Sequence, residues 1–562
     1  MALLNIQNLH ISFKTKSSET FAVKGIDLAI SKGESLGLVG ESGSGKSLTA
    51  LSVMGLLPAQ ALLPQGQILF NKADILGISP RKMNKLRGKH ISMIFQEPMS
   101  SLNPVMRCGQ QISEAILRHQ KVNKYEAKKK VVELIKLVNL PRPEQLATAY
   151  PHELSGGQRQ RIMIAMAIAN HPDLLIADEP TTALDVTVQQ EILLLLDRLR
   201  KENDMALLFI SHDLGVVAKV CDNVAVMLKG EIVEQGNSLS VFSNPQHPYT
   251  KGLLACRPPL NTRPARLPVI EDFLSGEKTN ANNIPISPPE KIQFDKLKPL
   301  LTIDNLRKSY VTERNILGKA IKSIQPVDDV SFQVFPGETL GLVGESGCGK
   351  TTLGRTILKL IAADSGRIVF NERDISLLNS LETRQLRREM NIVFQDPYSS
   401  LNPRMSIGEA IIEPMIVHGL YKNKKHRKEK AGELLERVGL TNEMMNRFPH
   451  EFSGGQRQRI VIARALALQP RFIICDEAVS ALDVSVQAKV LNLLNDLKRD
   501  FGFTYIFISH DLSVVKYMSD RIMVMKDGKI IEIGAPDALF QHPQTDYTRK
   551  LISALPALPI NN

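Results

Sequence analysis

The sequence has few cysteines and no long apolar run. Its five cysteines are scattered along the chain without a close pair, which argues against a disulfide framework and against a zinc or iron–sulfur site. The most apolar segments, such as residues 205–210, are far shorter than the ~20 residues that a membrane-spanning helix needs. The first residues lack a basic start and an apolar core, so we expect no signal peptide. These absences favour a reducing compartment, in the cytosol or at a membrane surface.

A strong excess of one charge is also missing. The 70 basic and 58 acidic residues give a formal net charge of +12. That charge is compatible with nucleic acid, with anionic lipid headgroups and with plain solvation. Hydrophobic residues make up 43% and charged residues 23%, which is the balance of a globular protein. The length allows roughly two to four domains.

The chain contains an internal repeat. Three motifs occur twice, about 300 residues apart: Gly40–Ser47 and Gly344–Thr351, Leu154–Arg161 and Phe452–Arg459, Ile210–Leu214 and Ile508–Leu512. A period of this size indicates a duplicated domain. Between the copies, several prolines and a polar run that cannot bury apolar surface predict a linker. We expect a first domain over residues 1–260, a linker over 261–299 and a second domain over 300–562.

Each copy has the pattern of an α/β fold. Ser35–Val39 and Thr339–Val343 are short apolar runs that end in a glycine-rich turn, and a helix-like segment follows each turn. Two later apolar runs, residues 173–177 and 471–475, end in acidic pairs. Buried strands that alternate with helices predict a mostly parallel sheet.

The glycine-rich turns match a phosphate-binding loop. Glycines let backbone N–H groups turn inward, and the N-terminus of the following helix adds partial positive charge. We expect Lys46 and Lys350 to reach the β- and γ-phosphates, and the hydroxyls of Ser47 and Thr351 to bind Mg²⁺. The predicted loop residues are Gly40, Ser42, Gly43, Gly45, Lys46 and Ser47, and Gly344, Ser346, Gly347, Gly349, Lys350 and Thr351.

Acidic pairs and histidines lie at the ends of other apolar runs. Asp178 and Asp476 are expected to hold the Mg²⁺ shell at the carboxyl ends of their strands. Because side chains alternate along a strand, Glu179 and Glu477 can point elsewhere and polarise the attacking water as general bases. A histidine at the end of a further strand is well placed to contact the γ-phosphate. These histidines are His212 and His510.

Taken in order, the motifs resemble one protein family. A phosphate loop, a glutamine after an apolar strand, Ser-Gly-Gly-Gln, an Asp-Glu pair, Ala-Leu-Asp and Ser-His-Asp occur in this order twice. This order is similar to that of the ATP-binding cassette (ABC) ATPases, and it covers nearly the whole chain. The resemblance implies two tandem P-loop ABC-type nucleotide-binding domains, each a core sheet with a helical subdomain. Such domains bind ATP with Mg²⁺ and hydrolyse it.

In this family the two ATP sites are shared between the cassettes. The resemblance implies that one set of residues faces Ser453, Gly455 and Gln456 of the other half: Lys46, Ser47, Gln96, Asp178, Glu179 and His212. The second set would face Ser155, Gly157 and Gln158: Lys350, Thr351, Gln395, Asp476, Glu477 and His510. A serine and glycine N–H groups at a helix N-terminus form an anion site, which suits the γ-phosphate.

The resemblance assigns further roles near these sites. Gln96 and Gln395 are counted among both the catalytic and the magnesium-binding residues. Phe13 and Tyr310 lie where the family places an aromatic ring against adenine, and ordinary strand packing is the alternative for both. Neither set of motifs lacks a residue needed for hydrolysis, so two hydrolytic sites are expected.

One branch of the family is similar to this chain in two further segments. The segments after the glutamines, residues 96–104 and 395–403, are similar to those of the ATPases of peptide/nickel importers, which include dipeptide, oligopeptide and glutathione systems. Residues 246–254 and 542–551 resemble the C-terminal extension of that branch. Some members carry a cysteine cluster in this extension, but only Cys256 is nearby here, so we expect no iron–sulfur cluster.

The resemblance also implies partners and a location. They are two membrane permease subunits, met by the loop after each glutamine, and an extracytoplasmic solute-binding protein that acts through the permeases. The chain would be peripheral, on the cytoplasmic face of the inner membrane. Two basic stretches, residues 121–130 and 421–430, are either solvated helix faces or contacts with anionic lipid headgroups.

Two functions other than transport are compatible with fused cassettes. A ribosome-associated double-cassette ATPase, such as a translation factor, is the main alternative, but those proteins usually have a long charged helical linker. A DNA-repair ATPase would need zinc-ligand cysteines or long heptads inside a cassette. The proline-rich linker and uninterrupted cassettes favour neither, so no nucleic acid is expected.

Overall fold

The chain forms two compact units of similar design. The computed structural model describes residues 2–14, 19–62, 64–96, 101–182, 184–275, 297–314 and 320–555. Among these residues, the first unit comprises those up to Leu254 together with 270–275. The second unit comprises residues 255–269 together with 297–555. Parts of the predicted motifs and linker, namely residues 97–100, Ala183 and 276–296, lie outside the described ranges.

The centre of the first unit is a six-stranded sheet with the order β10-β9-β3-β8-β7-β6. Five of these strands run parallel, and β10 pairs antiparallel with β9. Every residue of β3, β7 and β8 is buried, as expected for parallel strands that are covered on both faces. The strands are β3 (Ser35–Val39), β6 (Ile91–Ile94), β7 (Leu174–Asp178), β8 (Ala206–Ser211), β9 (Asn223–Leu228) and β10 (Glu231–Asn237).

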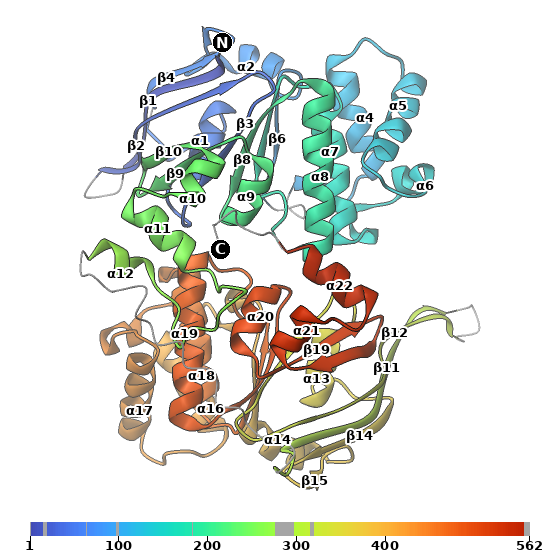
Figure 1. Ribbon diagram of the computed structural model, residues 1–562, viewed down its shortest axis with the longest axis vertical. Coiled ribbons are helices and arrows are strands. Elements are labelled where there is room, and N and C mark those ends of the chain that lie inside the picture. Colours follow the sequence, from blue (N-terminus) through green and yellow to red (C-terminus); the bar gives the residue numbers. More distant parts are fainter. Residues whose placement is uncertain are drawn as a thin grey trace. The chain divides into compact units, whose positions relative to one another are not determined.

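A second, antiparallel sheet covers part of the first unit. Its order is β2-β1-β4-β5, and its inward side chains join those of the parallel strands in one apolar core. The strands are β1 (Ala2–Lys14), β2 (Glu19–Ser31), β4 (Gln65–Phe70) and β5 (Ala73–Asp74). Its strand β2 packs against α1, the helix that follows the phosphate loop (Figure 1).

Helices complete the first unit, and some of them form a separate subdomain. α4, α5 and α6 pack on one another, α4 and α5 also pack on α7, and these helices form the helical subdomain at one side of the sheet (Figure 1). The helices are α1 (Lys46–Val53), α2 (Pro80–Leu86), α4 (Cys108–His119), α5 (Lys124–Leu137), α6 (Pro143–Thr148), α7 (Gly156–Ile168), α8 (Val186–Asn203), α9 (Leu214–Val220), α10 (Ser238–Ser243), α11 (Pro248–Ala255) and α12 (Ile270–Leu274). A short 3-10 turn, η1 (Pro151–Glu153), precedes α7.

The second unit repeats both sheets in the same order. Its parallel-type sheet runs β16-β17-β18-β13-β19-β20, and its antiparallel sheet runs β12-β11-β14-β15. The strands are β11 (Leu301–Arg314), β12 (Ala320–Val334), β13 (Thr339–Val343), β14 (Ser365–Phe370), β15 (Arg373–Asp374), β16 (Met390–Val393), β17 (Phe472–Asp476), β18 (Thr504–Ile508), β19 (Arg521–Lys526) and β20 (Lys529–Gly534). The predicted α/β class with a mostly parallel sheet is confirmed.

The helices of the second unit follow the same plan, with α16 and α17 packed on α18. They are α13 (Lys350–Ile357), α14 (Ser380–Glu389), α15 (Pro397–Ser400), α16 (Ile407–Val417), α17 (Lys424–Arg437), α18 (Gly454–Leu466), α19 (Val484–Phe501), α20 (Leu512–Met518), α21 (Pro536–Gln541) and α22 (Asp546–Ser553), with the 3-10 turns η4 (Asn442–Asn446) and η5 (Pro449–Glu451). Across the described ranges, no helix combines the length and apolar character needed to cross a membrane.

Candidate nucleotide sites

Sheet topology brings the predicted motifs together at one edge. In the first unit, β3, β8, β7 and β6 are neighbours and run parallel. Their carboxyl ends therefore meet at the same edge, which is where open α/β sheets bind ligands. The phosphate loop follows β3, His212 follows β8, Glu179 follows β7, and Gln96 follows β6. The second unit places its own motifs on β13, β18, β17 and β16 in the same way.

The phosphate loop of the first unit holds its lysine close to the backbone. The ammonium of Lys46 donates to the carbonyls of Gly40 and Glu41, both at 2.8 Å. Gly43 has a φ of 80°, and a Cβ on it would meet no atom within 4 Å. The loop therefore has an open side that a phosphate oxygen can approach. This fit, together with the N-terminus of α1, matches the predicted cradle.

The second loop has the same geometry. The ammonium of Lys350 donates to the carbonyls of Gly344 at 2.7 Å and Glu345 at 2.9 Å. A Cβ on Gly347 would again meet nothing within 4 Å. Cys348 replaces Ser44 beside the lysine, and its sulfur lies 3.9 Å from the ammonium. The two loops are therefore equivalent in their backbone conformation and in the position of the lysine ammonium.

Each loop hydroxyl lies beside the first carboxylate of its acidic pair. Ser47 donates to Asp178 at 3.2 Å, and Thr351 donates to Asp476 at 3.0 Å. Burial raises the pKa of Asp178 to about 6 and also raises the pKa of Asp476, and the hydroxyl in each site opposes the shift. Hydroxyl and carboxylate oxygens are ligands that Mg²⁺ takes, so these pairs fit a magnesium ion.

Glu179 lies at the centre of a hydrogen-bonded cluster. Its carboxylate accepts from Gln96 at 2.9 Å and from Thr182 at 2.9 Å, and it lies 3.1 Å from Nδ1 of His212. Burial alone would raise the pKa of Glu179. The hydrogen bonds from His212 and Thr182 and the charges of His212 and Lys46 outweigh burial and lower this pKa to about 2. The carboxylate is therefore ionised near neutral pH, as a general base must be.

Glu179 points away from Asp178 for a reason that differs from the predicted one. The sequence suggested that the two lie in one strand and alternate, but β7 ends at Asp178. Glu179 has a φ of 47°, in the left-handed region, and its N–H donates to the carbonyl of Ile210 on β8 at 2.9 Å. Non-glycine residues are uncommon there, and such strain collects at functional sites. Glu477 repeats the geometry, with a φ of 49°.

The second cluster matches the first except at one contact. Glu477 accepts from Gln395 at 2.8 Å and lies 3.3 Å from Nδ1 of His510. Despite burial, the hydrogen bond and charge of His510 lower the pKa of Glu477, and Glu477 in turn raises the pKa of His510. Ser480 donates to the backbone carbonyl of Glu477 at 2.9 Å, whereas Thr182 donates to a carboxylate.

The Ser-Gly-Gly-Gln segments lie at the N-termini of helices, whereas the other motifs lie at the ends of strands. Ser155 caps α7: it accepts from the N–H of Gln158 at 3.3 Å, and its own N–H donates to that side chain at 3.0 Å. Ser453 and Gln456 form the same box at the start of α18. Both serines are exposed. The hydroxyls and first-turn N–H groups are thus displayed at a helix N-terminus, where an anion is favoured.

The two predicted adenine-stacking rings differ in exposure. Phe13, near the end of β1, is partly buried and packs against the apolar core of the first unit. Tyr310, on β11, is 41% exposed, and the ammonium of Lys308 lies 5.5 Å from its ring centre. Tyr310 is therefore the more exposed of the two rings, while Phe13 packs against the core.

Two kinds of residue in these clusters were not predicted from the sequence. Thr182 follows the acidic pair by three positions and gave no signal, because a lone threonine fits any turn. The hydroxyls of Tyr249 and Tyr547 contact the phosphate loops, although a tyrosine in a segment rich in Pro and Thr reads as ordinary packing. The duplicated spacing of these tyrosines from the other motifs was the one signal that could have identified them.

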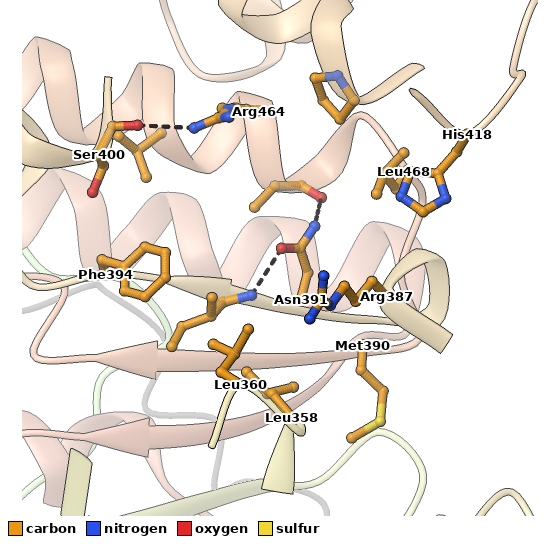
Figure 2. A pocket seen from close by; sticks show the side chains of 14 residues that line it. Leu358, Leu360, Arg387, Met390, Asn391, Phe394, Ser400, His418, Arg464 and Leu468 are labelled. Carbon is orange, nitrogen blue, oxygen red and sulfur yellow. Dashed lines mark hydrogen bonds between the residues drawn. The ribbon is translucent and has the colours of Figure 1, made fainter. Parts of the chain in front are cut away.

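The second unit also contains a cavity of about 270 Å³ beside the strand that leads to Gln395. Figure 2 shows that its lining is mixed, with the apolar side chains Leu358, Leu360, Met390, Phe394 and Leu468 and the polar side chains Arg387, Asn391, His418 and Arg464. Arg464 donates to the carbonyl of Ser400 at 2.8 Å. The cavity is thus lined both by helices of the helical subdomain and by the segment after Gln395.

Comparison with known proteins decides the family. The family profile described as "ABC transporter" matches residues 23–182 and 327–480. A Pectobacterium atrosepticum protein, "Glutathione import ATP-binding protein GsiA", is 46% identical over 99% of this chain and 89% of its own length. This chain belongs to the ABC transporter family. The predicted resemblance to fused cassettes is confirmed, and this ABC protein is an ATPase.

Further similarities concern the extension that follows each cassette. A profile described as "Oligopeptide/dipeptide transporter, C-terminal region" matches residues 233–282 and 531–562 of this ABC protein. The Escherichia coli K12 protein of the same GsiA name is 47% identical over 99% of this chain and 89% of its own. Among solved structures, the dimeric post-hydrolysis state of the cassette MJ0796 matches 42% of this chain and 98% of its own at 28% identity, with a TM-score of 0.38.

Proposed function

We propose that this chain is the ATP-hydrolysing subunit of an importer that takes up a peptide-like solute. The observation that carries the proposal is the presence of two complete strand-end clusters in one chain that is similar over nearly its whole length to glutathione import ATP-binding proteins. The matches to a peptide-transporter C-terminal region favour a peptide-like solute. These similarities do not favour the alternative, a ribosome-associated ATPase.

The phosphate loops hold the nucleotide in this proposal. Lys46 and Lys350 leave the loop carbonyls and donate to the β- and γ-phosphates, while the glycine N–H groups surround the phosphate oxygens. Magnesium, when bound, neutralises phosphate charge and would be held by the hydroxyls, carboxylates and amides already described. These groups are Ser47, Asp178 and Gln96 in one site and Thr351, Asp476 and Gln395 in the other.

Hydrolysis needs a base at the attacking water. Glu179 and Glu477 are ionised and partly buried, and each accepts a hydrogen bond from a glutamine that can instead orient water. His212 and His510 lie against these carboxylates and would contact the γ-phosphate when it is present. The low pKa of Glu179 keeps this base available over the physiological pH range.

Each site is proposed to be completed by the signature residues of the other cassette. Ser155, Gly157 and Gln158 would serve the site of Lys350, and Ser453, Gly455 and Gln456 would serve the site of Lys46. The capped helix starts support this role, because their N–H groups and serine hydroxyls suit a phosphate. Tyr310 would stack on adenine, and Phe13 would do so in the first site.

Coupling to transport requires membrane partners. We propose two permease subunits, each contacting the loop after one glutamine, and a solute-binding protein that acts through the permeases. The cavity in Figure 2 supports the permease contact, because Phe394 and Ser400 from the vicinity of that loop line it. The chain would lie on the cytoplasmic face of the inner membrane, where residues 121–130 and 421–430 could meet anionic headgroups. In this proposal the first domain covers residues 1–260, the linker 261–299 and the second domain 300–562.

Replacing the two bases tests the function. Glu179→Gln and Glu477→Gln keep size and hydrogen bonding but remove the base, and the double variant should hydrolyse ATP at least about 100-fold more slowly. Each single variant should lower turnover measurably, since both sites are proposed to be competent. Glu202→Gln, on the exposed surface of α8, is the matched control. Unchanged turnover in either single variant would show that the corresponding site is not catalytic.

A further inference from the structure

A tyrosine from the segment after each cassette reaches the phosphate loop of the same unit. The hydroxyl oxygen of Tyr249 accepts a hydrogen bond from the N–H of Glu41 at 3.0 Å, and Tyr249 is fully buried. The hydroxyl oxygen of Tyr547 accepts from the N–H of Glu345, also at 3.0 Å. The contact is therefore present twice, in regions separated by a whole domain.

These bonds are made to the same peptide group that holds the lysine. The peptide that joins Gly40 to Glu41 receives Lys46 on its oxygen at 2.8 Å and gives its N–H to Tyr249. In the second unit, the peptide that joins Gly344 to Glu345 receives Lys350 at 2.7 Å and gives its N–H to Tyr547. Hydrogen bonds at both ends of one amide polarise and orient it. The tyrosine thus fixes the plane of the peptide whose carbonyl accepts the hydrogen bond from the lysine.

The segment that carries each tyrosine is anchored independently. The carboxylate of Glu234 on β10 accepts from the N–H groups of Gln246 at 2.7 Å and His247 at 3.1 Å, just before α11. Glu532 on β20 accepts from Gln544 at 2.9 Å and from the hydroxyl of Thr548 at 2.6 Å. The turn before each tyrosine is therefore tied to the sheet, which aims the ring at the loop.

We infer that Tyr249 and Tyr547 are positioning residues through which the C-terminal segment of each cassette sets the phosphate-loop lysine. This inference rests on ATP binding at the loop. Phenylalanine would keep the packing but could not accept the amide hydrogen. A partly buried N–H that loses its acceptor is destabilising, so the peptide would rotate and take its carbonyl away from the lysine. The loss should then fall on the phosphates that the lysine reaches.

Two fluorescent nucleotides separate this role from a structural one. Trinitrophenyl-ATP has the β- and γ-phosphates, and trinitrophenyl-AMP lacks them. In the full-length chain, Tyr249→Phe with Tyr547→Phe should raise the dissociation constant of the ATP analogue about tenfold, the effect of one lost buried hydrogen bond. The dissociation constant of the AMP analogue should stay unchanged. Tyr505→Phe, which removes another buried hydroxyl that donates to Leu494, should change neither.

The outcomes are distinct. If the wild-type chain bound neither analogue, the proposed function itself would fail. If it bound both and the tyrosine variant either matched it or weakened both analogues equally, the positioning role would be wrong. Glu234→Gln with Glu532→Gln provides a second route in case the first variant does not fold, because it loosens the anchored turn and leaves the hydroxyls in place. This variant should also weaken the ATP analogue selectively; an equal loss for both analogues contradicts the inference.

Discussion

At the scale of single residues, glycines of one loop have different tasks. Gly349 has a φ of 112°, and a Cβ on it would collide with the carbonyl oxygen of Pro326 on β12. Gly347 has a φ of 83°, but a Cβ on it would meet nothing within 4 Å. The first glycine is thus required by the fold, while the second leaves space on the ligand side.

Alanine at these two positions should separate stability from binding. Gly347→Ala should lower the free energy of unfolding by about 1–2 kcal/mol, the cost of a left-handed alanine, and should weaken ATP binding because its methyl group enters the cradle. Gly349→Ala carries the same backbone cost plus the collision, so its melting temperature should fall clearly further. Thermal unfolding and ATP titration of both variants give the comparison. Equal melting temperatures would contradict the assignment.

The residues predictable from sequence were those with a rare and local pattern. A glycine loop that ends in Lys46 and Ser47 has few alternative uses, and the strand ends of Asp178 and His212 follow from apolar runs. Tyr249 was not predictable, because its partner is a backbone N–H that is distant in sequence, and Thr182 was not, because a lone threonine is typical of any turn. The left-handed φ of Glu179 was also invisible, since no residue type announces it.

At the scale of elements, the segment that follows α11 packs on the second unit. The side chain of Asn492 on α19 accepts from the N–H of Leu267 at 2.9 Å and donates to its carbonyl at 2.8 Å. Lys516 on α20 donates to the carbonyl of Leu260 at 2.7 Å. Leu267 is fully buried. Residues 255–269 are therefore a packed strap on α19 and α20.

Removing the asparagine should release this strap. Asn492→Leu removes the two side-chain hydrogen bonds to the backbone of Leu267, which should lower the free energy of unfolding by about 1–3 kcal/mol. Trypsin should then cut more rapidly after Arg266, because Arg257 and Arg263 each precede a proline and trypsin does not cut there. The control is Leu194→Asn at the matching position of α8, where the side chain is 63% exposed and the change should be nearly neutral. Unchanged trypsin cleavage in Asn492→Leu would show that these bonds do not hold the strap.

Elements with a clear period were predicted well, and the strap was not. The apolar runs 35–39 and 339–343 are buried parallel strands, as expected. Prolines and polar residues between the copies predicted only a linker, because hydrogen bonds between a backbone and one distant asparagine leave no periodic pattern. The helical subdomains came from the family resemblance, and composition alone did not indicate them.

At the scale of the whole molecule, two equivalent sets of catalytic groups imply cooperation. Each unit has its own phosphate loop, base, glutamine and histidine. Each unit also has one capped Ser-Gly-Gly-Gln helix start. The hydrogen bonds described above do not join this helix start to the glutamate cluster of the same unit. We propose that these helix starts complete the site of the opposite cassette.

The most direct test replaces the signature serines with residues that cap equally well. The hydroxyls of Ser155 and Ser453 accept from the N–H groups of Gln158 and Gln456. Asp and Asn can accept the same hydrogen bonds, so helix stability should be similar. Only Asp puts a negative charge where a phosphate would approach. We predict that Ser155→Asp with Ser453→Asp abolishes ATP hydrolysis, while Ser155→Asn with Ser453→Asn retains much more of it. Hydrolysis at the wild-type rate in the aspartate variant would contradict shared sites.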